Sequence, residues 1–578
     1  MTAKRQNDSD HEHVKTITRS IVFGMEPPVT LSSVTNALET AITVAKGLGR
    51  NGPYDMDRLV RELRSTCTVT FAEEAGVLKN LDHKSWVYSP RAVNLPWDFW
   101  ERYKDWLLRI EEFPTEPLRK LEEHSHLILD LLEDPERAGP WSRRGLVVGQ
   151  VQSGKTMNFT ALINKAADAG YKLIIVLAGL WENLRYQTQG RLSEGFLGKE
   201  SQRFELNDDS RVGVGLIKTD PRAWCGTSLS ADFSKPKKSF GAVLGKENPL
   251  PFLLVVKKNK SILNNVRDWV LDSSNVVVRE DGTKVIKDVP LLIIDDEADH
   301  ASINTNDVPL NDDDTVDEEH SPTAINGGIR KILSLFERNA YVGYTATPFA
   351  NVFIRPDSKA TDAGEDLFPR SFIVNLPTPS NYVGAAQLFG YDEDDPYNLT
   401  EHIRPRVLIP VNDYQNWVPD KHKNGFEPGG ILPDTLKRAM RSFVLVCAAR
   451  IVRGQQDKHN TMLIHVTRFS SVQDEVAKQV KTELSTIQRR LKYDDAGSDA
   501  IHKELRKIWE EDFVPVSRSF GEPDISYDDL IPHLKTASGQ ISPPKIINGK
   551  AKDVLDYEKG TAHLIAIGGK QTLARIDS

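Results

Sequence analysis

Length, composition and charge narrow the class of this protein before any motif is considered. Its 578 residues exceed what one hydrophobic core organises, so we expect about three or four domains. A net charge of −8 excludes a uniformly basic nucleic-acid-binding protein, so any such site must be a local patch. Only three, widely spaced cysteines are present, and no apolar run is long enough to span a bilayer. These features predict a soluble cytoplasmic protein without a membrane segment.

The character of the sequence changes near residue 141. Residues 1–30 are polar and predict a loose tail. Residues 31–140 predict a helical region, because the runs VTNALETAITVAKGLG and FWERYKDWLLRIEEF carry apolar residues at three- and four-residue spacing. Residues 141–355 alternate polar helical stretches with the apolar runs GLVVG, KLIIVLAG, LLIIDD and AYVGYTAT. Such runs are typical of strands buried on both faces of a parallel sheet, so this region predicts an α/β domain.

The rest of the chain predicts a linker and a second α/β lobe. Residues 356–435 are rich in Pro, Gly, Asn and Asp, as linkers and irregular insertions are. Residues 436–578 contain a helical run, LKRAMRSFVLVCAARIVRG, and two strand-like runs, TMLIHV and HLIAIGG. This alternation predicts part of a second α/β lobe. The acidic run at 311–320 predicts a solvated loop.

A phosphate-binding loop is the strongest motif in the sequence. The run GQVQSGKT fits the P-loop pattern in full, and it lies between the strand GLVV and a helix that begins near Met157. This pattern predicts that the backbone N–H groups of the loop bind phosphate. It also predicts that Lys155 supplies a charge for the β- and γ-phosphates and that the Thr156 hydroxyl is a ligand for Mg²⁺. The predicted cofactors are therefore ATP and Mg²⁺. The predicted nucleotide-binding residues are Gly149, Gln150, Ser153, Gly154, Lys155 and Thr156.

A cluster of carboxylates follows the apolar strand in LLIIDDEADH. Ligands bind at the carboxyl ends of strands in open α/β sheets, so this cluster and the P-loop are expected at one edge. Hydrolysis requires one carboxylate that holds Mg²⁺ and one that orients the attacking water. We assign Asp296 to the metal and Glu297 to the water, and Asp295 competes for the metal. Lys155, Glu297 and Asp296 are thus the predicted catalytic residues.

The third motif is AYVGYTATPFAN, in which a TAT segment follows an apolar strand. The GKT, DEAD and TAT-P elements, in this order, resemble those of superfamily-2 helicases and translocases. The resemblance implies a RecA-like P-loop lobe in which the TAT segment couples hydrolysis to movement of the lobes. It also implies that Asp299 contacts Thr345 or Thr347.

Longer strings narrow the resemblance. GLWENLRYQTQGRL, NYVGAAQLFG, HNTMLIHVTRF and HLIAIGG, together with VVGQVQSGKT and LLIIDDEADHASIN, resemble the Z1-domain family. Those proteins are superfamily-2-like ATPases, often labelled endonucleases, that are encoded near bacterial antiphage and restriction-type genes. The resemblance spans about 141–569 and implies nucleic acid, DNA first, and other defence proteins as partners. It places Arg185, Gln187 and Gln189 near the nucleic-acid path, although a solvated helix face is an equal interpretation.

The C-terminal segment departs from the family pattern. After HLIAIGG the family continues into an Asn-x-Leu-Ser-Arg-Gly-like segment, whereas this sequence continues KQTLARIDS. Arg575 stands near the place of the family arginine, at a shifted spacing and without the following glycine. The departure predicts an incomplete second RecA-like lobe that lacks its arginine finger, and slow turnover as a result.

Three functions remain open at the level of sequence. The first is a nucleic-acid-dependent ATPase of the helicase or translocase type. The second is an ATP-gated endonuclease, although neither Pro433-Asp434 nor Pro523-Asp524 has a partner in a recognisable nuclease pattern. The third is a nucleotide-dependent scaffold with little turnover.

Overall fold

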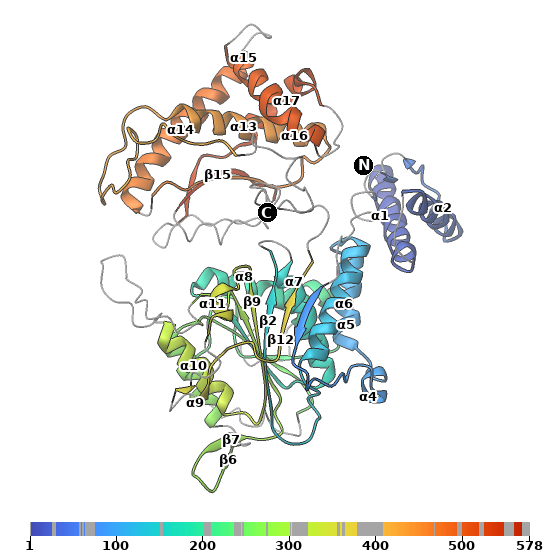
Figure 1. Ribbon diagram of the computed structural model, residues 1–578. Helices are drawn as coiled ribbons and strands as arrows, with labels where there is room; N and C mark the ends of the chain where they lie inside the picture. Colours follow the sequence, from blue (N-terminus) through green and yellow to red (C-terminus); the bar gives the residue numbers. More distant parts are fainter. Residues whose placement is uncertain are drawn as a thin grey trace. The chain divides into compact units, whose positions relative to one another are not determined.

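The computed structural model divides the chain into two compact units, residues 1–382 and 383–578 (Figure 1). Each unit is considered by itself. The residues that the structure describes are 2–25, 31–56, 59–60, 63, 75–150, 154–200, 210–235, 244, 248–272, 276–300, 302, 322–354, 359–360, 364–377, 408–467, 469–493, 500–519, 525–547 and 560–568.

An eight-stranded sheet organises the first unit, in the order β1-β12-β2-β9-β8-β3-β5-β4. Neighbouring strands run parallel throughout, except that β1 is antiparallel to β12. The strands are β1 (Gly76–Lys79), β2 (Trp141–Val148), β3 (Leu173–Ala178), β4 (Trp224–Cys225), β5 (Phe252–Val256), β8 (Leu291–Asp296), β9 (Arg338–Thr345) and β12 (Phe372–Asn375). The P-loop strand β2 and the acidic strand β8 are separated by β9 alone. The prediction of an α/β lobe with a parallel sheet is confirmed.

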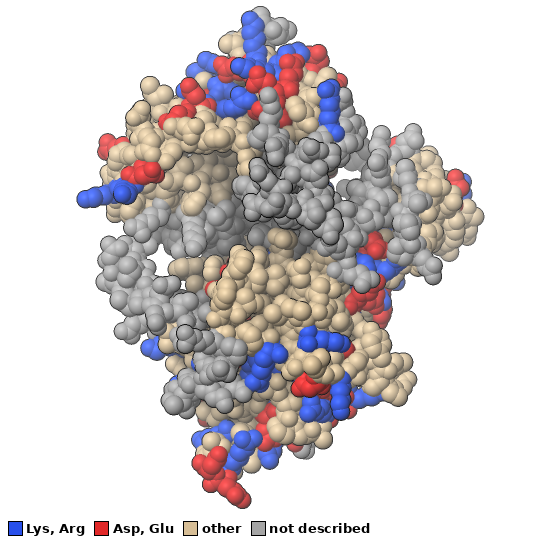
Figure 2. Space-filling model, viewed as in Figure 1, with Lys and Arg blue, Asp and Glu red and all other residues tan. Residues whose placement is uncertain are grey.

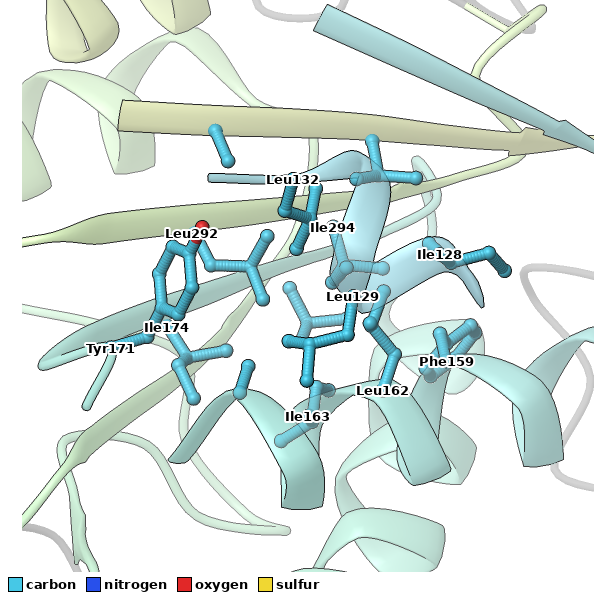
Figure 3. Packing of buried hydrophobic residues seen from close by; sticks show 14 of the residues in the cluster. Ile128, Leu129, Leu132, Phe159, Leu162, Ile163, Tyr171, Ile174, Leu292 and Ile294 are labelled. Carbon is cyan, nitrogen blue, oxygen red and sulfur yellow. The ribbon is translucent and has the colours of Figure 1, made fainter. Parts of the chain in front are cut away.

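Helices cover both faces of this sheet (Figure 1). Because side chains alternate along a strand, Leu292 and Ile294 of β8 enter one core, and Leu291 and Ile293 enter the other. Figure 3 shows the first core, where side chains of the helices α6 and α7 meet those of β3 and β8. The helices that pack on the first face include α6 (Thr115–Leu131) and α7 (Lys155–Ala169), and those on the second include α9 (Lys260–Leu271) and α10 (Pro322–Ser334).

Strand β12 corrects the prediction that residues 356–435 are only a linker or insertion. Phe372–Asn375 pairs with Gly145–Val148 and lies inside the main sheet. The register sets Phe372 against Gly145, where an added Cβ would lie 2.0 Å from Cζ of the phenylalanine ring. The glycine is therefore what lets the ring cross the neighbouring strand.

The N-terminal region also differs from its prediction. Within the predicted loose tail, α1 (Thr2–Phe23) is instead a helix, whose buried Val14 and Val22 pack with Leu38 of α2 (Leu31–Gly47). Apolar residues at helical spacing stabilise α1 despite its many polar residues. The predicted helical region at 31–140 also contains the strand β1. Among its described residues it also contains the helices α4 (Pro90–Val93), α5 (Asp98–Arg109) and α6.

The second unit contains a parallel three-stranded sheet in the order β13-β15-β14. Its strands are β13 (Asn460–Ile464), β14 (Lys545–Ile547) and β15 (His563–Gly568). The α-helices in its described part are α13 (Asp434–Val452), α14 (Ser470–Tyr493), α15 (Ala500–Ile508), α16 (Val514–Ser519) and α17 (Tyr527–Gln540). Val444, Val476 and Ile567 join helices and sheet in one core. The alternation predicted for 436–578 is present in the part described.

The remaining elements are short, and the surface mixes both signs of charge. These elements are α8 (Glu182–Leu192), α11 (Phe349–Val352), β6 (Val276–Val278), β7 (Lys284–Ile286), β10 (Lys359–Ala360), β11 (Gly364–Glu365) and the helical turns Ser193–Leu197, Gly213–Leu216 and Trp509–Phe513. On the face shown in Figure 2, basic and acidic side chains intermingle over the helices of the second unit. Among the described residues, no helix is both long enough and apolar enough to cross a membrane.

Candidate nucleotide-binding site

The P-loop connects β2 to α7 at the carboxyl edge of the sheet. The Gly149 N–H donates to the Thr345 carbonyl at 3.0 Å, which ties the start of the loop to the end of β9. Gly154 has φ +84°, a conformation that favours glycine, and it leads directly into α7 at Lys155. Residues 151–153, and with them the predicted Ser153, lie outside the described residues.

Lys155 lies close to the predicted carboxylate cluster. Burial lowers the pKa of Lys155, and the negative charges of Asp296, Glu297 and Asp299 act in the opposite direction. Its ammonium group donates to the carbonyls of Gly149 at 3.0 Å and Gln150 at 2.9 Å. The fold therefore brings together the predicted phosphate-binding lysine and the acidic residues of a distant motif.

The two neighbouring aspartates of β8 point to opposite faces of the sheet. Asp295 follows the Leu291–Ile293 side, is fully buried, and forms an ion pair with Lys258 at 2.7 Å. It also accepts a hydrogen bond from the Tyr341 hydroxyl at 2.6 Å. Asp296 follows the face that α7 covers, and it is half-buried. Asp295 was the alternative metal ligand in the sequence analysis, but it bonds Lys258 and Tyr341 on the other face of the sheet.

Glu297 stands in a turn with a strained backbone. Its φ of +55° lies in the left-handed region, which is uncommon for residues other than glycine and is often found at functional sites. His300 Nδ1 lies 3.5 Å from Glu297 Oε2, and this contact lowers the pKa of Glu297. Burial and the charge of Glu297 raise the pKa of Asp296 to about 6. The two carboxyl groups therefore differ in acidity, with Glu297 the stronger acid and Asp296 the weaker one.

Asp299 connects the acidic motif to the TAT segment. Its carboxylate accepts hydrogen bonds from Thr345 Oγ1 at 2.7 Å and from Thr347 Oγ1 at 2.5 Å. The Thr347 N–H donates in turn to Thr345 Oγ1 at 2.9 Å. Burial acts to raise the pKa of Asp299, but these hydrogen bonds lower it below its ordinary value. The contact that the sequence implied is present with both threonines, whereas a role in coupling remains a prediction.

The donor set fits Mg²⁺ bound together with phosphates. Thr156 follows Lys155 in the first turn of α7, and Asp296 supplies a carboxylate from the same region. Mg²⁺ usually takes one or two protein oxygens and fills its shell with water and phosphate oxygens. Within the described ranges, no group of three or more His, Cys, Asp or Glu side chains is arranged to hold a metal ion. The Thr156 hydroxyl and the Asp296 carboxylate are oxygen donors of the kind that Mg²⁺ prefers.

One further cation lies at the site and was missed from the sequence. Arg191, in the last turn of α8, donates to Thr156 Oγ1 at 3.2 Å. No motif marks this arginine, because its proximity depends on how α8 packs beside α7. A positive charge next to the predicted metal ligand extends the cationic part of the site beyond Lys155.

The side chains predicted near a nucleic-acid path on α8 are mostly buried. Arg185 is fully buried and donates to the carbonyls of Ser228 and Leu229, each at 2.8 Å. Gln189 is also fully buried and accepts from the Thr227 hydroxyl at 2.7 Å. Both interpretations, a nucleic-acid contact and a solvated face, are therefore wrong for these two residues, because α8 is anchored to the loop after β4. Gln187 is half-buried.

The fold and this edge of the sheet define an α/β lobe with a P-loop. Residues 435–575 match the family model of the Z1 domain. No curated protein matches. Among solved structures, the helicase domain of Hef from Pyrococcus furiosus is 11% identical, with a TM-score of 0.26 over 78% of this chain and 87% of that one. The 54 kDa signal recognition particle protein from Aeropyrum pernix K1, in complex with GDP, is 13% identical, with a TM-score of 0.15 over 91% and 99%. Neither structural likeness is close enough to bear on function.

Proposed function

We propose that this protein binds ATP with Mg²⁺ and hydrolyses it, and that hydrolysis drives a helicase-like motor of the Z1 type. The observation that carries the proposal is the convergence of Lys155 with Asp296, Glu297 and Asp299 at the carboxyl edge of a parallel sheet. A helix N-terminus after a glycine-rich loop is a ready site for phosphate. Carboxylates beside it serve the metal and the attacking water.

Each residue of the site has a separate task in this proposal. Lys155 and the N-terminus of α7 bind the phosphates, and Thr156 and Asp296 hold Mg²⁺, which neutralises phosphate charge when bound. Glu297 orients and deprotonates the attacking water. Asp299, through its two threonine contacts, passes a change at the acidic motif to the end of β9.

The substrate and setting of the motor are proposed on narrower support. The Z1 match over 435–575 and the order of the GKT, DEAD and TAT-P elements favour nucleic acid, DNA first, as the polymer. The same match supports a role in bacterial antiphage or restriction-type defence beside other proteins. The proposal does not include a nuclease step.

The test is ATP hydrolysis by the full chain with and without single- and double-stranded DNA. The parent should hydrolyse ATP faster when DNA is present, and Lys155→Ala should abolish hydrolysis. Lys172→Ala is the matched control, because this half-buried lysine precedes β3 at the opposite edge and its ammonium group donates to the Pro249 carbonyl. A Lys155→Ala variant as active as the parent refutes the site. Nucleotide binding without turnover points to the scaffold, and metal-dependent nicking by a pure preparation points to the endonuclease.

A further inference from the structure

A buried lysine lies directly behind the turn that carries Glu297. Lys258 follows β5, and its side chain is fully buried on the sheet face that α9 covers. Its ammonium group donates to the Glu297 carbonyl at 2.6 Å and to the His300 carbonyl at 3.1 Å. It also forms the 2.7 Å ion pair with Asp295. All three partners lie on the strand end and turn that hold the proposed catalytic carboxylate.

This arrangement has features that core packing alone does not require. Burying an ammonium group is unfavourable unless it is paired and hydrogen-bonded, and Lys258 is both. The backbone of Glu297 is in the left-handed region at φ +55°, a conformation that persists only where the surroundings enforce it. The bonds from Lys258 to the carbonyls of Glu297 and His300 close both ends of this turn. The lysine thus holds the strained backbone in place.

We propose that Lys258 is a positioning residue for ATP hydrolysis, which fixes the turn at Glu297 from the face of the sheet opposite the P-loop. The inference rests on the proposed function, because Glu297 is the residue whose placement matters. Asp295 balances the charge of Lys258, and the Tyr341 hydroxyl fixes Asp295. Lys258 lies on the other face from α7, so it acts on the geometry of the water-orienting carboxylate and leaves phosphate binding to Lys155.

The test separates positioning from folding. Lys258→Met alone leaves Asp295 as an unpaired buried charge, so this variant is strongly destabilised. The double variant Lys258→Met/Asp295→Asn removes both charges, keeps an acceptor for the Tyr341 hydroxyl, and still removes the two bonds to the turn. Lys257→Met is the matched control, because Lys257 pairs with Glu182 on the other face.

The measurements are kcat and KM for ATP, binding of fluorescent ADP, and thermal melting. The double variant should lose about 100-fold in kcat, as small misplacements of reacting groups do, with ADP binding within about threefold of the parent. Lys257→Met should match the parent in all of these. A folded double variant with the parent's kcat, or one that loses ADP binding and kcat together, overturns the inference. A parent that binds ADP but hydrolyses no ATP overturns the proposed function as well, so the two failures are distinguishable.

Discussion

Thr345 and Thr347 both donate a hydrogen bond to the Asp299 carboxylate, so the contributions of the two bonds to stability can be compared. Thr345 is 1% exposed and Thr347 is exposed, yet each donates its hydroxyl to a different oxygen of Asp299. We consider Thr345→Val and Thr347→Val, which replace the hydroxyl with a methyl group of similar size. Both substitutions remove a hydroxyl that donates to Asp299, so the two variants differ in burial and in the Thr347 N–H bond that Thr345 Oγ1 also accepts.

The expected magnitudes differ clearly. A buried hydrogen bond to a charged group contributes about 1.5–3 kcal/mol, and its loss leaves the carboxylate less well solvated. Thr345→Val also removes the acceptor of the Thr347 N–H. We therefore expect Thr345→Val to lower the free energy of unfolding by about 2–3 kcal/mol. Water replaces the hydroxyl at the exposed position, so Thr347→Val should lower it by less than about 1 kcal/mol.

The assay is urea unfolding of the full chain, followed by tryptophan fluorescence, for the parent and both variants. Fluorescent ADP binding should remain close to that of the parent, because neither threonine is proposed to hold phosphate. Equal losses for the two variants, or a larger loss for Thr347→Val, would refute the argument from burial. A Thr345→Val variant as stable as the parent would show that Asp299 is satisfied without this bond.

Two further changes test the fold on which the site is built. Gly145→Ala should lower the free energy of unfolding by about 1–3 kcal/mol or more, measured in urea, because the new Cβ would lie 2.0 Å from the Phe372 ring; a parent-like melt would mean that β12 does not pack as described. Arg185→Met should also lower stability, because the hydrogen bonds from this buried guanidinium to the partly buried carbonyls of Ser228 and Leu229 are lost. DNA affinity of this variant should stay unchanged once it is folded, and a selective loss of DNA binding would restore the nucleic-acid interpretation.

The central strands could be predicted because their apolar runs are long and bounded by motifs. The runs before the P-loop, the acidic cluster and the TAT segment are the strands β2, β8 and β9, and all three lie in one sheet, as expected. Strands β1 and β12 were missed, because each has four residues and carries no periodic signal of its own. Their identity depends on pairing with each other and with β2, which is information that a single run does not contain.

The same limit applies to the site. Alternation along β8 requires Asp295 and Asp296 to face opposite sides, but it does not say which side carries the P-loop helix. Lys258 and Arg191 belong to no motif and reach the site only through the packing of β5 and α8. Conversely, an arginine such as Arg185 is expected at the surface, yet it is buried here and its guanidinium donates to backbone carbonyls of a distant loop. The motif residues could thus be predicted from the sequence, whereas the residues that support them could not.

Part of the connection between the three motifs runs through the main chain. The Gly149 N–H bonds the Thr345 carbonyl, and the Ala298 N–H bonds the Tyr344 carbonyl, each at 3.0 Å. Substitution to alanine removes neither link, so an alanine scan of the site would register Asp299 and its threonines and overlook them. Alanine variants alone would therefore give an incomplete account of the contacts that connect the three motifs. Amide hydrogen exchange at Gly149 and Ala298 measures the protection of these two backbone N–H groups directly.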